Sequence, residues 1–237
     1  MFFLMEEHMK FLCISDVHGN TKALDDLNEV FKTVDAVLFA GDFSECFKTQ
    51  TARPVLESLL KKHDEIYAVL GNCDEPSFSE SLDKAGINAE RTLTYTAGLA
   101  IIGSGGGSKF TGKTPNERTL EELQSDFDIL LSAEKDGDED GKWHNLIVIS
   151  HNPPKASIVD SFAPGMHAGS ELFTKFIEEK EPLFVLTGHI HEGVGIEKIG
   201  KTLVMNPGSL GEKGTYGILT VTKTEDGFSA SCELKDL

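Results

Sequence analysis

The chain has 237 residues, of which 39% are hydrophobic and 26% charged, and this composition excludes a disordered or membrane-embedded protein. Lys and Arg number 22 against 39 Asp and Glu, so the net charge of −17 disfavours nucleic-acid duplexes and anionic lipid surfaces as partners. The length suits one core, and we expect residues 1–237 to form a single domain.

The sequence predicts a cytoplasmic protein. Its apolar opening, residues 1–5, is too short for the core of a signal peptide and runs into two glutamates. No apolar run approaches the roughly 20 residues that cross a bilayer. The cysteines form no C-x-x-C pair, so we expect reduced thiols rather than a disulfide framework. They are Cys13, Cys46, Cys73 and Cys232.

Short apolar runs alternate with helical patterns along the first half of the chain, which predicts strands and helices stacked in layers. Residues 21–31 illustrate the helical pattern, because apolar side chains recur there at three- and four-residue intervals. The expected strands are residues 11–14, 36–40, 66–70 and 99–102, and the expected helices are residues 21–31, 54–60, 79–85 and 120–131.

The second half begins with an acidic surface loop at residues 136–141 and then becomes largely β. We find no internal repeat and no linker that would divide the chain. The expected strands are residues 146–149, 184–186, 196–199, 203–205 and 218–221, with one helix at 171–177.

Metal-capable side chains follow directly after the predicted strands. Because loops at the carboxyl ends of strands converge on one crevice in layered α/β proteins, residues far apart in sequence can meet there. Seven oxygen and nitrogen donors exceed the needs of one tetrahedral ion and suffice for two ions that share a carboxylate. These residues are Asp16, His18, Asp42, Asn72, His151, His189 and His191.

The same residues carry a resemblance to a known family. In chain order, five blocks resemble the motifs of calcineurin-like metallophosphoesterases, and the loop at residues 206–209 resembles one near the end of small prokaryotic members. The blocks are Asp16-Val17-His18-Gly19-Asn20, Gly41-Asp42, Gly71-Asn72-Cys73-Asp74, Ser150-His151-Asn152 and Gly188-His189-Ile190-His191.

The resemblance implies a four-layer αββα sandwich, an α/β (α+β) fold in which two mixed β-sheets face each other and helices cover both outer faces. It also implies two divalent ions: manganese suits the donor set, with iron, zinc or nickel as alternatives. By the resemblance Asp16, His18 and His191 hold the first ion, Asn72, His151 and His189 hold the second, and Asp42 bridges both. A hydroxide that bridges the metals would then attack a small-molecule phosphate ester.

One position departs from many members of that family, which carry a histidine after the asparagine ligand. This chain has Cys73 there, as do similar small prokaryotic phosphodiesterases with a G-N-C-D motif. A thiol is a less usual general acid than imidazole, so we expect a phosphodiesterase rather than an enzyme for alkyl phosphomonoesters. The expected catalytic residues are Asp42, Asn72, Cys73, Asp74 as an orienting group, and His167 as a loop residue that could supply the acid.

Three further functions stay open at the level of sequence. Residues 107–114 fit the G-x-x-x-x-G-K-[ST] pattern of P-loop nucleoside triphosphatases, but Pro115 follows and the next helical pattern begins later, so we expect this loop to border the substrate pocket instead. The same fold would also suit a phosphomonoesterase or nucleotide hydrolase, or a non-catalytic metal-binding scaffold. The sequence leaves the oligomeric state open.

Overall fold

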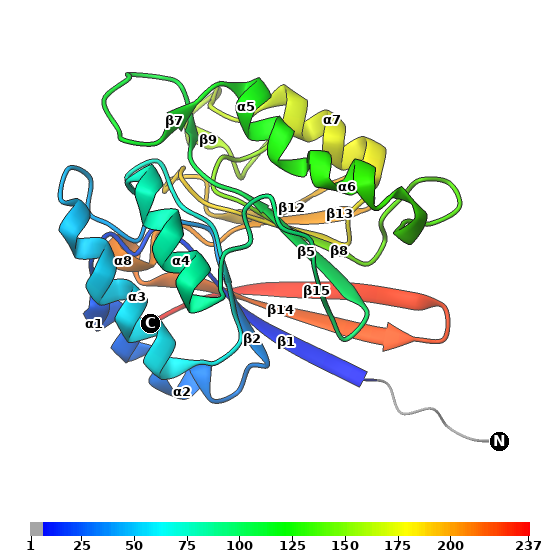
Figure 1. The fold of residues 1–237 in the computed structure, drawn as a ribbon, viewed down its shortest axis with the longest axis horizontal. Helices are drawn as coiled ribbons and strands as arrows, with labels where there is room; N and C mark the ends of the chain where they lie inside the picture. Colours follow the sequence, from blue (N-terminus) through cyan, green and yellow to red (C-terminus); the bar gives the residue numbers. More distant parts are fainter. Residues whose placement is uncertain (1–6) are drawn as a thin grey trace.

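The computed structural model describes residues 7–237, in which two mixed β-sheets face each other (Figure 1). The apolar opening at residues 1–5 lies outside the described residues. The first sheet has the order β15-β14-β1-β2-β3 and the second has the order β12-β13-β11-β8-β5-β4. The strands of the first sheet are β1 (Glu7–Ile14), β2 (Ala36–Phe39), β3 (Ile66–Ala68), β14 (Thr215–Thr224) and β15 (Gly227–Asp236).

Parallel pairs form the middle of each sheet. In the first sheet β1 and β2 run parallel, as do β2 and β3, while β14 pairs antiparallel with β1. In the second sheet β11 runs parallel to both β8 and β13, and β5 runs parallel to β8. The strands of the second sheet are β4 (Thr94–Thr96), β5 (Leu99–Ser104), β8 (Leu146–Ser150), β11 (Phe184–Thr187), β12 (Gly195–Ile199) and β13 (Thr202–Asn206).

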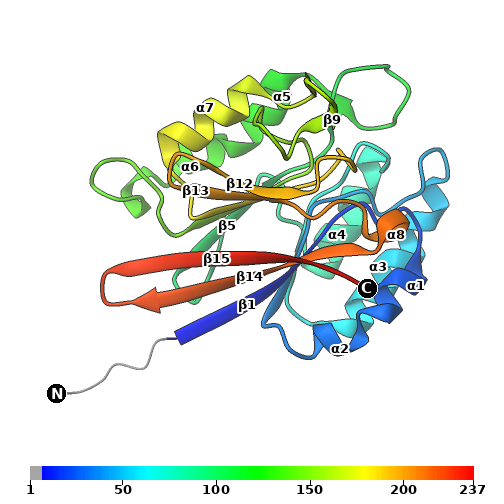
Figure 2. The ribbon, with the colours of Figure 1, turned by 180° about the vertical axis from the view of Figure 1, so that it is seen from behind.

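Helices cover the outer face of each sheet, so the molecule has four layers (Figures 1 and 2). On the first sheet lie α1 (Thr21–Asp26), α2 (Asn28–Phe31), α3 (Ala52–Lys62) and α4 (Ser79–Ala85), with the short α8 (Leu210–Lys213) beside α1. On the second sheet lie α5 (Leu120–Ser125), α6 (Ile129–Ser132) and α7 (Glu171–Lys180). The expected αββα sandwich is therefore confirmed.

Three apolar cores hold these layers together, because central strands such as β2, β5, β8 and β11 bury both faces. Leu12 and Ile14 of β1 pack with the helices on the first sheet, whereas Phe11 and Cys13 pack between the two sheets. A third core lies between the second sheet and its helices and includes the buried Trp143. This layering explains why the central strands read as continuous apolar runs, and it buries Cys13 between the sheets.

Two predicted helices are interrupted. Residues 21–31 form α1 and α2, which are separated at Leu27. Residues 120–131 form α5, a 3-10 turn η3 (Asp126–Asp128) and α6. Asp126 is buried at this turn and accepts hydrogen bonds from Ser104 and Arg118, so a tertiary contact overrides the helical periodicity.

The ten-residue strand β15 is absent from the predicted elements. Its inward residues Phe228, Ala230, Cys232 and Leu234 alternate with polar ones, and they pack on the core between the sheets. This two-residue period was the available signal. The remaining short elements are β6 (Gly107–Ser108), β7 (Glu117–Arg118), β9 (Ser161–Ala163), β10 (Met166–His167) and the 3-10 helices η1 (Thr49–Thr51), η2 (Pro76–Phe78) and η4 (Glu134–Asp136).

Among residues 7–237, no helix has both the length and the apolar character needed to cross a bilayer.

Candidate metal centre

All seven predicted metal ligands lie in loops that leave the carboxyl ends of strands. Asp16 and His18 follow β1, and Asp42 follows β2. Asn72 follows β3, His151 follows β8, and His189 and His191 follow β11. Since both sheets send these loops toward the same end, the structure brings residues from the two halves of the sequence to one site.

The backbone at this site is unusual for residues with side chains. Asp16, His18, Asp42 and His189 have positive φ angles of 53°, 47°, 59° and 69°. Left-handed backbone at non-glycine residues costs on the order of 1 kcal/mol or more and occurs where the surroundings enforce it, often at functional sites. The loops are also tight, because a Cβ at Gly71 would overlap the Asp42 carboxylate.

Asp16, His18 and His191 form one group of donors. His191 Nε2 lies 3.2 Å from Asp16 Oδ1 and 3.2 Å from His18 Nε2. His18 Nε2 lies 3.7 Å from Asp16 Oδ1. The three side chains therefore present their donor atoms within the space that one cation could share.

Asn72, His151 and His189 form a second group. His151 Nε2 lies 2.9 Å from Asn72 Oδ1, and the rings of His151 and His189 have centroids 5.1 Å apart.

Asp42 lies between the two groups. Its Oδ2 is 3.7 Å from His18 Nε2 and 3.6 Å from His151 Nε2. Its other oxygen, Oδ1, accepts a hydrogen bond of 2.8 Å from the Cys73 N–H. One carboxylate oxygen is thus held by the backbone while the other faces a histidine of each group.

Three of the histidines are oriented through Nδ1. His151 Nδ1 donates to the Ala40 carbonyl at 2.6 Å, and His18 Nδ1 donates to the Ser44 carbonyl at 3.1 Å. His191 Nδ1 lies 3.0 Å from Glu212 Oε2. Because these oxygens only accept hydrogen bonds, Nδ1 carries a proton in each ring, and in its neutral form the ring offers the Nε2 lone pair to a metal.

Two further observations indicate that the donor set suits divalent cations. The Nε2 atoms of His18 and His191 face each other at 3.2 Å, where two lone pairs would repel without a proton or cation beside them. In residues 7–237, the ion pairs of Asp16 and Asp42 all involve histidines, so no Lys or Arg neutralises these buried carboxylates. Buried charges of this kind are paired or coordinate metals.

Burial and neighbouring charges shift the pKa values of several groups at the site. Burial, together with the neighbouring charges of Asp16 and Asp74, raises the pKa of Asp42 well above its ordinary value. Burial lowers the pKa of His189 to about 3, so that ring is neutral and ready to bind. Although burial opposes it, the hydrogen bond with Asp16 raises the pKa of His191 to about 9, so a metal ion that bound there would have to displace a proton.

Asp74 does not face the donor groups but clamps the loops that carry them. Its carboxylate accepts hydrogen bonds from the backbone N–H groups of Phe43 and Ser44 at 3.1 and 2.8 Å, and from that of Gly71 at 2.8 Å. It thereby ties the Asp42 loop to the Asn72 loop through backbone hydrogen bonds.

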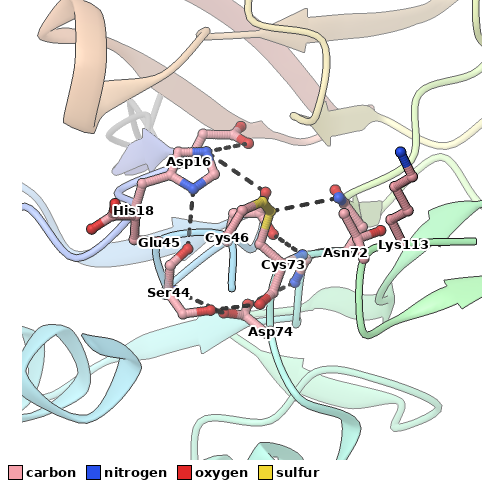
Figure 3. The surroundings of a disulfide bond; sticks show 12 residues. Asp16, His18, Ser44, Glu45, Cys46, Asn72, Cys73, Asp74 and Lys113 are labelled. Carbon is pink, nitrogen blue, oxygen red and sulfur yellow. Dashed lines mark hydrogen bonds and ion pairs between the residues drawn. A yellow bond between two sulfur atoms is a disulfide. The ribbon is translucent and has the colours of Figure 1, made fainter. Parts of the chain in front are cut away.

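Cys46 and Cys73 are joined by a disulfide, so the expectation of reduced thiols is wrong for this pair. Figure 3 shows it among the site residues, between His18 and Asn72. The loops after β2 and β3 meet here and bring the two Cα atoms to 4.7 Å, within the range that a disulfide spans. A disulfide sulfur has no proton to give, so Cys73 cannot act as a general acid in this form. Cys13 and Cys232 are free thiols.

The loop that fits the P-loop pattern does not have P-loop geometry. Its N–H groups at Phe110, Gly112 and Lys113 donate to the Glu117 carboxylate at 2.8, 2.8 and 3.0 Å. The next helix, α5, begins only at Leu120. The Glu117 carboxylate therefore occupies the place where the loop N–H groups of a P-loop would bind a nucleotide phosphate.

Some residues that build the site were not identified from the sequence. Glu212 orients His191, and Asp160 lies 2.9 Å from His167 Nδ1. The residue 206–209 loop supports the site: Asn206 Nδ2 donates to the Ile190 carbonyl at 2.8 Å, and Ser209 Oγ donates to the Asp16 carbonyl at 2.8 Å. The sequence signalled this loop by its motif but gave no sign of the roles of Glu212 and Asp160.

Several known proteins are similar to this chain over most of its length. An uncharacterized protein of Methanocaldococcus jannaschii is 32% identical over 210 residues, which cover 86% of this chain and 89% of that protein. A crystal structure of TT1561 from Thermus thermophilus matches with a TM-score of 0.67 and 18% identity over 90% of this chain and 94% of that one. A dimetal phosphatase from Danio rerio matches with a TM-score of 0.59 and 13% identity over 94% of this chain and 98% of that one.

The two structural matches agree with the fold described above. At the level of sequence, the profile of the calcineurin-like phosphoesterase superfamily domain matches residues 9–225 and so includes every loop of the metal centre. The chain therefore belongs to the calcineurin-like phosphoesterase superfamily.

Proposed function

We propose that this protein is a phosphodiesterase that works with two divalent cations. The observation that carries the proposal is the position of Asp42 Oδ2, 3.7 Å from His18 Nε2 and 3.6 Å from His151 Nε2, because one carboxylate oxygen then serves both donor groups. When bound, two divalent cations would lower the pKa of water and offset negative charge on the phosphoryl oxygens.

The chain's own residues divide between the two cation positions. Asp16, His18 and His191 hold one position, Asn72, His151 and His189 hold the other, and Asp42 joins them. Oxygen and imidazole donors suit manganese, with iron, zinc and nickel as alternatives. The thiol sulfurs of Cys46 and Cys73 are bonded to each other, which keeps the donor set free of thiolate.

We propose that His167 donates a proton to the leaving group. It lines the same cavity as Asn72 and His189, and its Nδ1 donates to Asp160. Replacing His167 with Gln should slow hydrolysis of diphenyl phosphate by roughly 100-fold but that of bis(4-nitrophenyl) phosphate far less, because nitrophenolate leaves without protonation. An equal loss on both substrates would assign His167 a role other than proton donation.

The function itself is tested with bis(4-nitrophenyl) phosphate and 4-nitrophenyl phosphate. We expect the manganese-loaded protein to prefer the diester, to lose activity on chelation and to regain it when manganese returns. A preference for the monoester would contradict the diesterase, and turnover that survives chelation would contradict the metal mechanism. The matched control is Lys113→Ala, which would abolish a P-loop activity but should leave this one intact.

A further inference from the structure

A cavity of about 470 Å³ opens beside the second donor group. Asn72 and His189 form its polar end, where a phosphate would meet the metal centre. The volume lies within the range of sites for small organic ligands. A substrate held at the metal centre therefore has room beside it for an organic group of limited size.

The other walls of the cavity are mainly apolar and aromatic. Phe110 comes from the loop after β6, Phe162 from β9, and Ile190 from between the two histidines that follow β11. Phe110 is 93% exposed and Phe162 38% exposed, so both rings face solvent although they lie on a shared cavity. Two exposed aromatic rings from distant segments at one cavity suggest a surface built to contact a ligand.

The backbone at Phe110 is held in place although the ring is exposed. The Glu117 carboxylate accepts the Phe110 N–H at 2.8 Å and also those of Gly112 and Lys113, which closes the loop on itself. These backbone hydrogen bonds, the Phe110 one first, lower the pKa of Glu117 to about 2, so the clamp stays ionised at neutral pH. The loop is also tied to the metal centre, because Asn152 Oδ1 accepts the Ser108 N–H at 2.9 Å.

We infer that the substrate is a phosphate diester with a planar aromatic group, which lies against Phe110 and Phe162 while its phosphate meets the metal centre. Aromatic side chains stack with many types of ring. The cavity should therefore favour substrates whose organic group is flat and small enough to fit, without requiring one particular ring. This inference rests on the proposed function. In the reaction, the water oxygen bonds to phosphorus, the bond from phosphorus to the ester oxygen breaks, and the leaving oxygen takes a proton.

Binding of two phosphonates tests the inference without requiring turnover. Phenylphosphonate and methylphosphonate share one charged group and differ in the ring, and calorimetry on the manganese-loaded protein gives a dissociation constant for each. We expect phenylphosphonate to bind about tenfold more tightly, since stacking of one ring commonly has an effect of that size. In Phe110→Ala/Phe162→Ala the ratio should fall to near one, while methylphosphonate binding stays unchanged.

Leu131→Ala is the matched control, because Leu131 is 60% exposed on α6 and does not line the cavity. Its ratio should equal that of the unmodified protein. Equal affinities in the unmodified protein, or a ratio that survives the double substitution, would overturn the inference. A protein that shows the expected ratio but hydrolyses no diester would instead refute the proposed function and leave the aromatic site standing.

Discussion

Histidine and carboxylate groups meet near both ends of β11, but the two sites balance charge in different ways. At the start of the strand, Glu181 lies 2.9 Å from Lys201, 3.1 Å from Lys142 and 3.3 Å from His144, all at the surface. Its hydrogen bonds with Lys201, Lys142 and His144 lower its pKa to about 2. Beyond the end of the strand lie His189 and His191, at the site where Asp42 enters from the loop after β2; Asp42 is buried with only histidines as ion-pair partners, and its pKa is raised.

The difference separates a solvated ion-pair cluster from a site that needs cations. A carboxylate with lysine partners in water is already satisfied, so the cluster at Glu181 requires no ligand. Asp42 is buried without such partners and its pKa is raised, so a divalent cation beside it would favour its ionised form. Asp16 differs: although burial opposes it, the hydrogen bond with His191 holds the pKa of Asp16 below its ordinary value.

The largest expected effect is on turnover. Asp42→Asn removes the one carboxylate that serves both donor groups, and we expect kcat for bis(4-nitrophenyl) phosphate to fall about 10³-fold. Glu181→Gln also removes a carboxylate that faces a histidine, but it should change kcat by less than about twofold. Steady-state kinetics measure kcat for both variants. Similar losses of kcat in Asp42→Asn and Glu181→Gln would contradict the distinction between the metal centre and the surface cluster at Glu181.

The second prediction concerns the link between the Asp42 and Asn72 loops. In protein purified without reductant, alkylation after denaturation should find the two free thiols Cys13 and Cys232. Reduction should expose Cys46 and Cys73 as well and lower the free energy of unfolding by about 3 kcal/mol, because the bond closes a loop between residues 27 positions apart. Cys232→Ser is the control, since it removes a thiol without touching the link. Finding Cys46 and Cys73 alkylated before reduction would contradict the disulfide.

The central fold and the meeting of the seven candidate ligands at one site could be predicted from sequence because their signals are local. Continuous apolar runs marked the buried strands, and the ligands stood directly after them, as with Asp16 and His18 after β1. The Cys46–Cys73 bond could not be predicted, because it depends on how closely two loops approach in space. The break at Asp126 likewise results from a tertiary contact with Arg118, which no helical period records.

Another buried carboxylate, Glu90, gives a smaller contrast with the surface residue Glu181. Glu90 Oε1 accepts the Leu70 N–H at 2.6 Å, two residues before Asn72, and burial raises its pKa from 4.5 to about 7. The folded protein therefore holds this proton more tightly than the unfolded chain. The resulting stability is fully present below about pH 4.5 and is lost as the pH rises through about 7.

Glu90→Gln keeps the acceptor for Leu70 but cannot ionise, so it should remove this pH dependence. Between pH 5 and pH 7 we expect the free energy of unfolding of the unmodified protein to fall by about 2 kcal/mol relative to that of the variant. Urea unfolding with a chelator present measures both proteins without the contribution of metal binding. Glu181→Gln should show no such difference in this window, because its pKa of about 2 leaves it ionised throughout. Parallel pH profiles for Glu90→Gln and the unmodified protein would mean that Glu90 is already ionised in the folded protein at pH 5. Burial beside the loops of the metal centre would then not raise the pKa of this carboxylate.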